Sequence, residues 1–234
     1  METSKALVVM DKNVLEFQKL AMPEVGDYEV LFHTKACSLC TLDRRTFLGT
    51  RNYQLPFLGG HECSGVIEKV GKGVVEVRPG DKAIFTSGYC MQCGLDRSGR
   101  GTQCRNKGKM PKHAAFEGWI QGGGLSEYLS IPAWQIIRMP DDVDFNHACL
   151  TEPLACCVHS IPKARIKMGD TVTIIGLGIM GYLQMKLALM QGARVVVSET
   201  DPGRQEKARA NGAHVVVDPS KEDAVKKLRS LTNG

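Results

Sequence analysis

The chain has 234 residues, a hydrophobic fraction of 43% and a formal net charge of +5 at pH 7. This length accommodates two modest domains, and so mild a charge does not require a nucleic-acid or membrane partner. No run of about eighteen apolar residues is present, so no membrane span is expected. Nine cysteines without a secretion signal indicate a reducing compartment, by default the cytoplasm, and metal ligation rather than disulfides.

Short β-rich runs, separated by turns that contain Gly and Pro, occupy the first part of the chain. The runs predicted as strands are Ala6–Met10, Glu29–Ala36, Gly65–Val70, Asp81–Phe85 and Leu125–Ile131. Many short strands with little helical periodicity between them are typical of all-β domains. Residues 1–152 are therefore predicted to form an all-β, barrel-like domain.

The period becomes helical over Asn146–Ile161, and strands then alternate with helices. The predicted strands are Thr171–Ile175, Arg194–Ser198 and Val215–Val217, and the predicted helices are Met180–Gln191, Arg204–Asn211 and Lys221–Leu231. This alternation predicts an α/β domain of the doubly wound, parallel-sheet (Rossmann) type over residues 153–234. Because such domains have about six strands, we expect a domain that is truncated at its C-terminus.

A thiol, an imidazole and carboxylates are candidate ligands of a catalytic zinc ion. Cys40 follows a predicted strand, His61-Glu62 lies behind the pair Gly59-Gly60, and Glu152 lies near a helix start. These ligand types can hold zinc with one coordination position open for chemistry. The alternative is a buried cysteine and a histidine bonded to a carbonyl group. The surrounding Gly-His-Glu-x-x-Gly run, twenty-one residues after Cys40, favours the metal site.

A glycine-rich turn predicts dinucleotide binding. Gly176-Leu177-Gly178-Ile179-Met180-Gly181 follows a predicted strand and opens a predicted helix, which is the context that this motif requires. Gly176 makes the turn, Gly178 admits the pyrophosphate, and Gly181 packs the helix on the strand. The predicted helix begins at Met180, directly after Ile179, and the free N–H groups of its first turn favour an anion.

The second strand of this domain ends in an acidic residue, Glu199, eighteen residues past Gly181. A carboxylate there can accept hydrogen bonds from the ribose hydroxyls and repels a 2′-phosphate, which favours NAD over NADP. Asp201 is a competing candidate for the same role. Arg204 could accept the 2′-phosphate instead.

A resemblance to a known family covers essentially all 234 residues, and four runs carry it. They are GGHECSGVIEKVGKGVVEVRPGDKA (Gly59–Ala83), GGLSEYLSIPAWQIIRMPDDV (Gly123–Val143), TEPLACCVH (Thr151–His159) and GDTVTIIGLGIMG (Gly169–Gly181). The chain resembles the zinc-containing medium-chain alcohol dehydrogenases, nearest the polyol (sorbitol-type) and threonine dehydrogenase branch. This resemblance implies a GroES-like catalytic domain of β-barrel type, followed by a Rossmann domain.

The resemblance implies that Cys40 and His61 bind the catalytic zinc. In that branch the glutamates that match Glu62 and Glu152 compete for direct and water-bridged places at the metal. We expect Cys40, His61, Glu62 and water as ligands, with Glu152 close by. Asp43 matches an aspartate that orients the ligand histidine; the alternative is an ordinary turn residue.

The chain departs from the family at two positions near Cys40. Leu42 replaces the hydroxyl residue that normally touches the reacting oxygen, and Arg45 stands where many members have a relay histidine. The proton is therefore expected to leave through water and a carboxylate, Glu62 or Glu152, unless the chemistry itself is altered.

A second cluster matches the family's structural zinc loop at three of four places. Cys90, Cys93 and Cys104 stand at offsets zero, three and fourteen, and Asp96 replaces the cysteine at offset six. A carboxylate can bind zinc, so a structural zinc site is expected; the alternative is a metal-free loop with free thiols. The surrounding basic residues, Arg97, Arg100, Arg105, Lys107, Lys109 and Lys112, have no interleaved aromatic residues and do not predict nucleic-acid binding.

These features predict a zinc-dependent, NAD-linked dehydrogenase of secondary alcohols, with a polyol or a hydroxy amino acid as substrate. The resemblance implies a homodimer or homotetramer for the full-length protein. The alternative is a truncated, inactive fragment or zinc-stabilised binding module. A reductase of activated double bonds is a third hypothesis, but its zinc-free relatives lack the pair Cys40 and His61.

Overall fold

The strands form where buried and exposed side chains alternate, as a half-buried strand requires. In β1 (Thr3–Asp11), Ser4, Ala6 and Val8 are buried, while Lys5 between Ser4 and Ala6 is exposed.

The computed structural model describes residues 2–86, 89–106 and 116–232. These residues form two compact units, with the boundary between Glu152 and Pro153.

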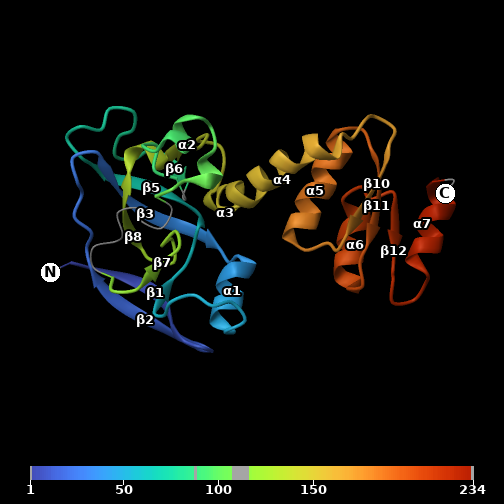
Figure 1. Ribbon diagram of the computed structural model, residues 1–234, viewed down its shortest axis with the longest axis horizontal. Coiled ribbons are helices and arrows are strands. Elements are labelled where there is room, and N and C mark those ends of the chain that lie inside the picture. Colours follow the sequence, from blue (N-terminus) through green and yellow to red (C-terminus); the bar gives the residue numbers. More distant parts are fainter. Residues whose placement is uncertain (1, 87–88, 107–115, 233–234) are drawn as a thin grey trace. The chain divides into compact units, whose positions relative to one another are not determined.

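The N-terminal unit contains two sheets (Figure 1). The first has the order β2 (Val14–Ala21), β1, β4 (Phe57–Leu58) and β7 (Trp119–Ile120). The second has the order β8 (Tyr128–Pro132), β3 (Glu29–Ser38), β5 (Glu62–Val70), β6 (Lys82–Phe85) and β9 (Ile136–Arg138). All five strands predicted in this part are present with shifted ends. Among the described strands neither sheet closes on itself, so the predicted barrel is two open sheets.

Short helices join these strands. They are α1 (Thr41–Phe47), α2 (Gly94–Arg97) and α3 (Phe145–Ala148), with 3-10 turns η1 (Gly101–Gln103) and η2 (Ala133–Gln135). The core of the five-stranded sheet includes Phe32, Ile67 and Phe85, and the Phe32 and Phe85 rings meet edge to face with centroids 5.5 Å apart. This core fixes the strands that carry the first metal-ligand group.

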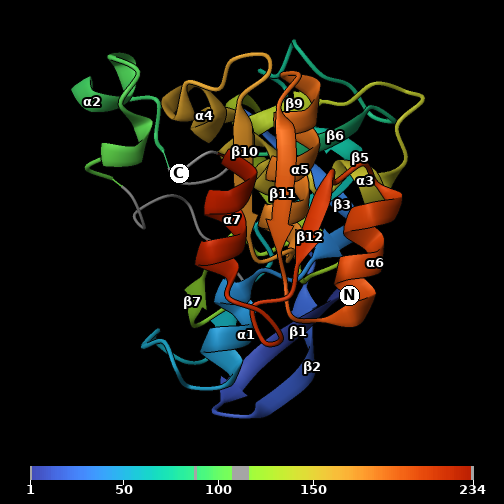
Figure 2. The ribbon, with the colours of Figure 1, turned by 90° about the vertical axis from the view of Figure 1, so that its right-hand side faces the viewer.

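The C-terminal unit is a parallel sheet with helices. Its strands are β10 (Thr171–Ile175), β11 (Arg194–Ser198) and β12 (Val215–Val217), side by side in this order in Figure 2. Its helices are α4 (Thr151–Ala164), which begins just before the boundary, α5 (Ile179–Met190), α6 (Pro202–Ala210) and α7 (Ala224–Thr232). In Figure 1, α5 and α6 lie on one side of the sheet and α7 on the other. Coverage on both faces explains why consecutive residues Val195, Val196 and Val197 are all buried.

In the described part of the chain, no helix combines the length and the apolar character needed to cross a lipid bilayer.

The core predicts a contrast between two phenylalanines of the N-terminal unit. Phe32→Ala should lower the free energy of unfolding by about 3–5 kcal/mol, because Phe32 is fully buried and the substitution leaves a cavity. Phe17→Ala should change it by less than about 0.5 kcal/mol, because Phe17 is 79% exposed. Urea unfolding followed by circular dichroism measures both. Equal effects would contradict the packing described above.

Candidate functional site

Cys40, His61 and Glu62 form the first candidate metal-ligand group, in which one ligand atom of each residue lies within 4.8 Å of the others. Cys40 caps the N-terminus of α1, directly after β3. His61 precedes β5, and Glu62 is the first residue of that strand. The antiparallel pairing of β3 with β5 places Ser38 opposite Glu62. Strand pairing therefore brings together ligands that are far apart in the sequence.

Asp43 links the two ligand segments. Its Oδ2 accepts a hydrogen bond from the Cys40 N–H (3.1 Å), and its Oδ1 accepts one from the Gly60 N–H (3.3 Å). A Cβ at Gly59 would lie 2.1 Å from Asp43 Oδ1, and Gly60 has φ +91°. Only glycine fits this approach. The structure thus places Asp43 against the backbone beside both ligands.

The side chains of this group are largely buried, with His61 10% and Glu62 6% exposed. His61 Nε2 lies 4.0 Å from Glu62 Oε1, and no hydrogen-bond partner of His61 Nδ1 occurs among the described residues. Burial raises the pKa of Cys40 to about 11, and the charge of Glu62 adds to that rise. Burial also raises the pKa of Asp43, although the charge of His61 opposes it.

A divalent cation bound here would lower the pKa of Cys40 instead of raising it, because a coordinating thiol loses its proton to the metal's charge. Thiolate, imidazole and carboxylate donors with an orphaned buried nitrogen fit zinc. Glu152, in the first turn of α4, lies outside the group of ligand atoms within 4.8 Å. Its place at the metal stays a prediction.

Cys90, Cys93, Asp96 and Cys104 form the second ligand group, also within 4.8 Å. Asp96 Oδ2 accepts hydrogen bonds from the N–H groups of Cys90 (2.6 Å) and Met91 (3.0 Å). Asp96 Oδ1 is buried and has no hydrogen-bond partner in the described part. One carboxylate oxygen is thus held by the backbone, and the other is left for a metal.

Hydrogen bonds also reach the sulfur atoms of this group. Cys90 Sγ accepts from the Cys93 N–H (3.3 Å) and from the Asn106 side-chain amide (3.2 Å), and Cys104 Sγ accepts from the Asn106 N–H (3.3 Å). Backbone N–H groups, that of Asp96 first, lower the pKa of Cys93. Burial acts to raise the pKa of Asp96, but hydrogen bonds from Cys90 and its neighbours outweigh it, and the pKa is lowered. These donors favour the ionised forms of Cys93 and Asp96, whereas burial raises the pKa of Cys104 to about 11. Two ionised ligands in the group fit a structural zinc, which would also deprotonate a coordinating thiol.

The glycine-rich turn joins β10 to α5. Gly176 has φ +81°, and its N–H donates to Ser198 O (2.8 Å) at the end of β11. A Cβ at Gly181 would lie 2.0 Å from Gly176 O, whereas one at Gly178, the N-cap of α5, would meet no atom within 4 Å. Ile179 and Met180 then open the helix, so the N–H groups of its first turn have no intrahelical acceptor.

Glu199 lies directly after β11, with its carboxylate turned toward this glycine-rich turn. Its Oε2 accepts from the Leu177 N–H (2.6 Å), and its Oε1 accepts from the N–H groups of Thr200 (2.8 Å) and Asp201 (3.0 Å). The hydrogen bonds from Asp201 and then Leu177 lower the Glu199 pKa. Arg204 Nη1 lies 3.8 Å from Oε2, and Asp201 caps α6 by accepting from the Arg204 N–H (2.8 Å).

Comparison with known proteins bears on both units. Residues 26–141 match the family model of the alcohol dehydrogenase GroES-like domain, and residues 177–234 match that of the zinc-binding dehydrogenases. The chain is 31% identical to L-galactonate-5-dehydrogenase of Escherichia coli K12 over 100% of its own length and 67% of the relative's. The chain belongs to the zinc-binding alcohol dehydrogenase family.

Two further relatives, one known by sequence and one by its crystal structure, are similar to the chain over both units. D-arabitol-phosphate dehydrogenase of Enterococcus avium is 31% identical over 94% of this chain and 62% of its own length. A crystal structure of a zinc-binding dehydrogenase from Sinorhizobium meliloti 1021, bound to NADP, superimposes with a TM-score of 0.85 at 31% identity, over 97% of this chain and 65% of that one. The chain therefore spans about two thirds of the length of these relatives.

These comparisons confirm the predicted family and fold class, a GroES-like domain followed by a Rossmann-type domain. The structure also contains features that the sequence did not reveal. Neither α1 nor β2 was predicted, and Asn106 was not expected near the second ligand group. Among the basic residues beside that group, Lys107, Lys109 and Lys112 lie outside the described residues.

Asp96→Ala should lower the zinc content from about two ions per chain to about one, because it removes the free Oδ1 and the acceptor for two N–H groups. Asp96→Cys, the matched control, should keep about two, since a thiolate can take the same place. Elemental analysis after dialysis against a chelator measures this. An unchanged zinc content in Asp96→Ala would contradict a ligand role.

Proposed function

We propose that the protein is a zinc-dependent dehydrogenase that oxidises a secondary alcohol to a ketone with NAD as the hydride acceptor. The observation that carries this proposal is the group Cys40, His61 and Glu62, whose ligand atoms lie within 4.8 Å of one another in a buried position. Zinc there supplies the Lewis acidity that eases deprotonation of an alcohol. The family to which the chain belongs supports the same reaction class.

In this proposal Cys40, His61 and Glu62 hold the metal, and Glu152 lies close by. Asp43 keeps the two ligand segments in place through its bonds to Cys40 and Gly60. The second group, Cys90, Cys93, Asp96 and Cys104, would bind a structural zinc.

The proton should leave along a route without a histidine relay. Arg45 is exposed and donates to Thr50 O (3.5 Å), and Leu42 has no hydroxyl. The remaining proton acceptors of this region are carboxylates, and Glu62 Oε1 lies 4.0 Å from His61 Nε2. We assign proton transfer to Glu62 or Glu152.

The dinucleotide should bind at the turn Gly176–Gly181, with its pyrophosphate beside Gly178, Ile179 and Met180. Glu199 is the proposed acceptor of hydrogen bonds from the ribose hydroxyls. Its lowered pKa and the hydrogen bond that it accepts from the Leu177 N–H support this role. Asp201 is already engaged as the cap of α6. An ionised Glu199 opposes a 2′-phosphate and favours NAD, and Arg204 beside it would limit that preference.

The names of the relatives support a polyol-like or hydroxy-acid substrate, since they include an L-galactonate and a D-arabitol-phosphate dehydrogenase. No disulfide joins any of the nine cysteines, all of which lie in the described part of the chain, and we infer a reducing compartment such as the cytoplasm. A homodimer or homotetramer is proposed from the family resemblance.

Cys40→Ala and His61→Ala should each lower zinc content by about one ion per chain and reduce NAD-linked oxidation of a polyol panel by at least about a hundredfold. NADH affinity should stay within about twofold, because the dinucleotide residues belong to the other unit. Cys156→Ala, at an exposed cysteine outside both ligand groups, is the control. Oxidation at the wild-type rate by Cys40→Ala or His61→Ala would contradict the zinc mechanism. Zinc and NADH binding without turnover in the wild type would favour an inactive binding module.

Glu199→Ala should weaken NADH binding by about tenfold or more, because it removes a charged acceptor of ribose hydroxyl bonds. The same change should leave NADPH binding equal or stronger, since it removes a repulsive charge. Fluorescence titration of both dinucleotides measures the ratio of the two dissociation constants. A ratio that does not change would show that Glu199 does not select the cofactor.

A further inference from the structure

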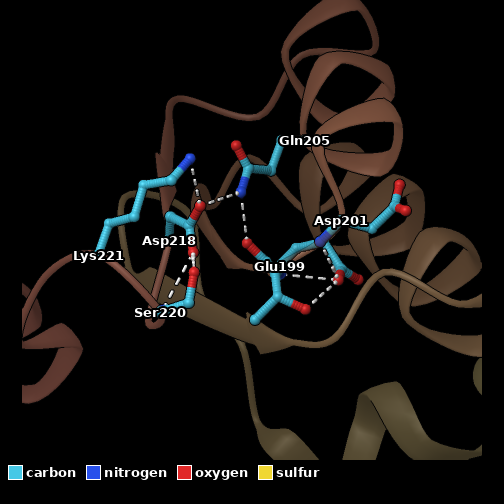
Figure 3. Close-up of polar contacts among 7 residues, drawn as sticks. Glu199, Asp201, Gln205, Asp218, Ser220 and Lys221 are labelled. Atoms are coloured by element: carbon cyan, nitrogen blue, oxygen red, sulfur yellow. Dashed lines mark hydrogen bonds and ion pairs between the residues drawn. The ribbon is translucent and has the colours of Figure 1, made fainter.

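Gln205 and Asp218 form a buried polar pair at the carboxyl ends of β11 and β12 (Figure 3). Gln205 lies on α6 and is 7% exposed, and Asp218 follows β12 and is 9% exposed. Gln205 Nε2 donates to Glu199 O (2.7 Å) and to Asp218 Oδ2 (2.9 Å). The amide NH₂ group of Gln205 thus donates one hydrogen bond to each of the two acceptors.

Burying such a pair has a cost that an apolar side chain would avoid. A buried amide is stable only if its donors find partners, whereas a leucine at this place on α6 could pack without any. The helix neighbour that shares this buried face, Ala208, is apolar. The geometry therefore points to a task for the hydrogen bonds beyond packing.

Asp218 is held in its ionised form. Its Oδ1 accepts from the Ser220 hydroxyl (2.5 Å) and N–H (3.0 Å), and Lys221 Nζ lies 3.1 Å from Oδ2. The bonds from Ser220 and then Gln205 lower the pKa of Asp218. Because an ionised carboxylate and a carbonyl oxygen flank the amide, only its NH₂ end can face them. Asp218 thereby fixes which way Gln205 points.

Gln205 in turn holds the carbonyl group of Glu199, and so the peptide plane between Glu199 and Thr200. The next two N–H groups, those of Thr200 and Asp201, donate to Glu199 Oε1, and Leu177 donates to Oε2. Two sets of hydrogen bonds, joined by the peptide bond between Glu199 and Thr200, thus link Asp218 through Gln205 to the carboxylate that faces the glycine-rich turn.

We propose that Gln205 and Asp218 are positioning residues that aim the Glu199 carboxylate at the ribose of the adenosine half of the dinucleotide. This inference rests on the proposed dinucleotide function. Without the pair, the loop that carries Glu199 loses its anchor, and the carboxylate no longer meets the ribose hydroxyl in a fixed orientation.

The test compares ADP with 2′-deoxy-ADP, each displacing NADH from the 234-residue chain in a fluorescence titration. The wild type should prefer ADP by about tenfold, the value of one hydrogen bond to a charged acceptor. Gln205→Leu, which keeps the volume but donates no bond, should reduce this preference below about threefold. Asp218→Asn keeps the shape of the side chain but can turn an acceptor into a donor, and it should also reduce the preference for ADP. This second variant tests the proposal if Gln205→Leu does not fold.

Lys221→Met is the matched control, because Lys221 is 74% exposed and contacts Asp218 from outside the path to Glu199. It should keep the tenfold preference. A loss of stability alone lowers the melting temperature without changing the ratio for the folded protein. A wild type that binds no NADH overturns the dinucleotide function and this inference together. If the wild type prefers ADP over 2′-deoxy-ADP, and folded Gln205→Leu and Asp218→Asn keep that preference, the positioning role alone is overturned.

Discussion

Burial of carboxylates is the constraint on which both metal-ligand groups of the N-terminal unit depend. Asp43, Glu62 and Asp96 are buried, and thiols lie beside them. Buried charges without compensation cost several kcal/mol each, and around Cys40 the cost appears as a raised thiol pKa. A divalent cation would offset this cost by adding positive charge among the ligands. Its binding would then be linked to the folding of these loops.

The C-terminal unit stabilises its buried carboxylates in a different way. Glu199 accepts three backbone hydrogen bonds, and Asp218 accepts from Ser220, Gln205 and Lys221. Hydrogen bonds lower the pKa values of Glu199 and Asp218, whereas burial raises the pKa of Asp43. Both carboxylates are thus ionised before any ligand arrives. This suits recognition of neutral hydroxyl groups, which donate to a preformed acceptor.

The sequence predicted those features that leave a local signal. The strands Thr171–Ile175, Arg194–Ser198 and Val215–Val217 were predicted to the residue, because each is rich in β-branched residues and too short for a helix. The strand β2 was missed because most of its side chains are exposed and do not alternate. α1 was missed because its seven residues cover less than two full turns. Gln205 and Asn106 leave no signal, since no sequence motif marks an amide as the partner of a carbonyl group or of a thiol.

The register of β3 against β5 explains why the first ligand group tolerates unusual neighbours. Cys40 and Glu62 are placed by the pairing of Ser38 with Glu62, and Asp43 ties the backbones of Cys40 and Gly60 together. Leu42 and Arg45 make neither of these contacts through their side chains, so exchanging a hydroxyl or an imidazole there leaves the ligand geometry intact. The family resemblance puts a hydroxyl residue and a relay histidine at these two positions, so their exchange bears on the route of the proton and not on the metal ligands. The fold can therefore keep its metal site while the route of the proton changes.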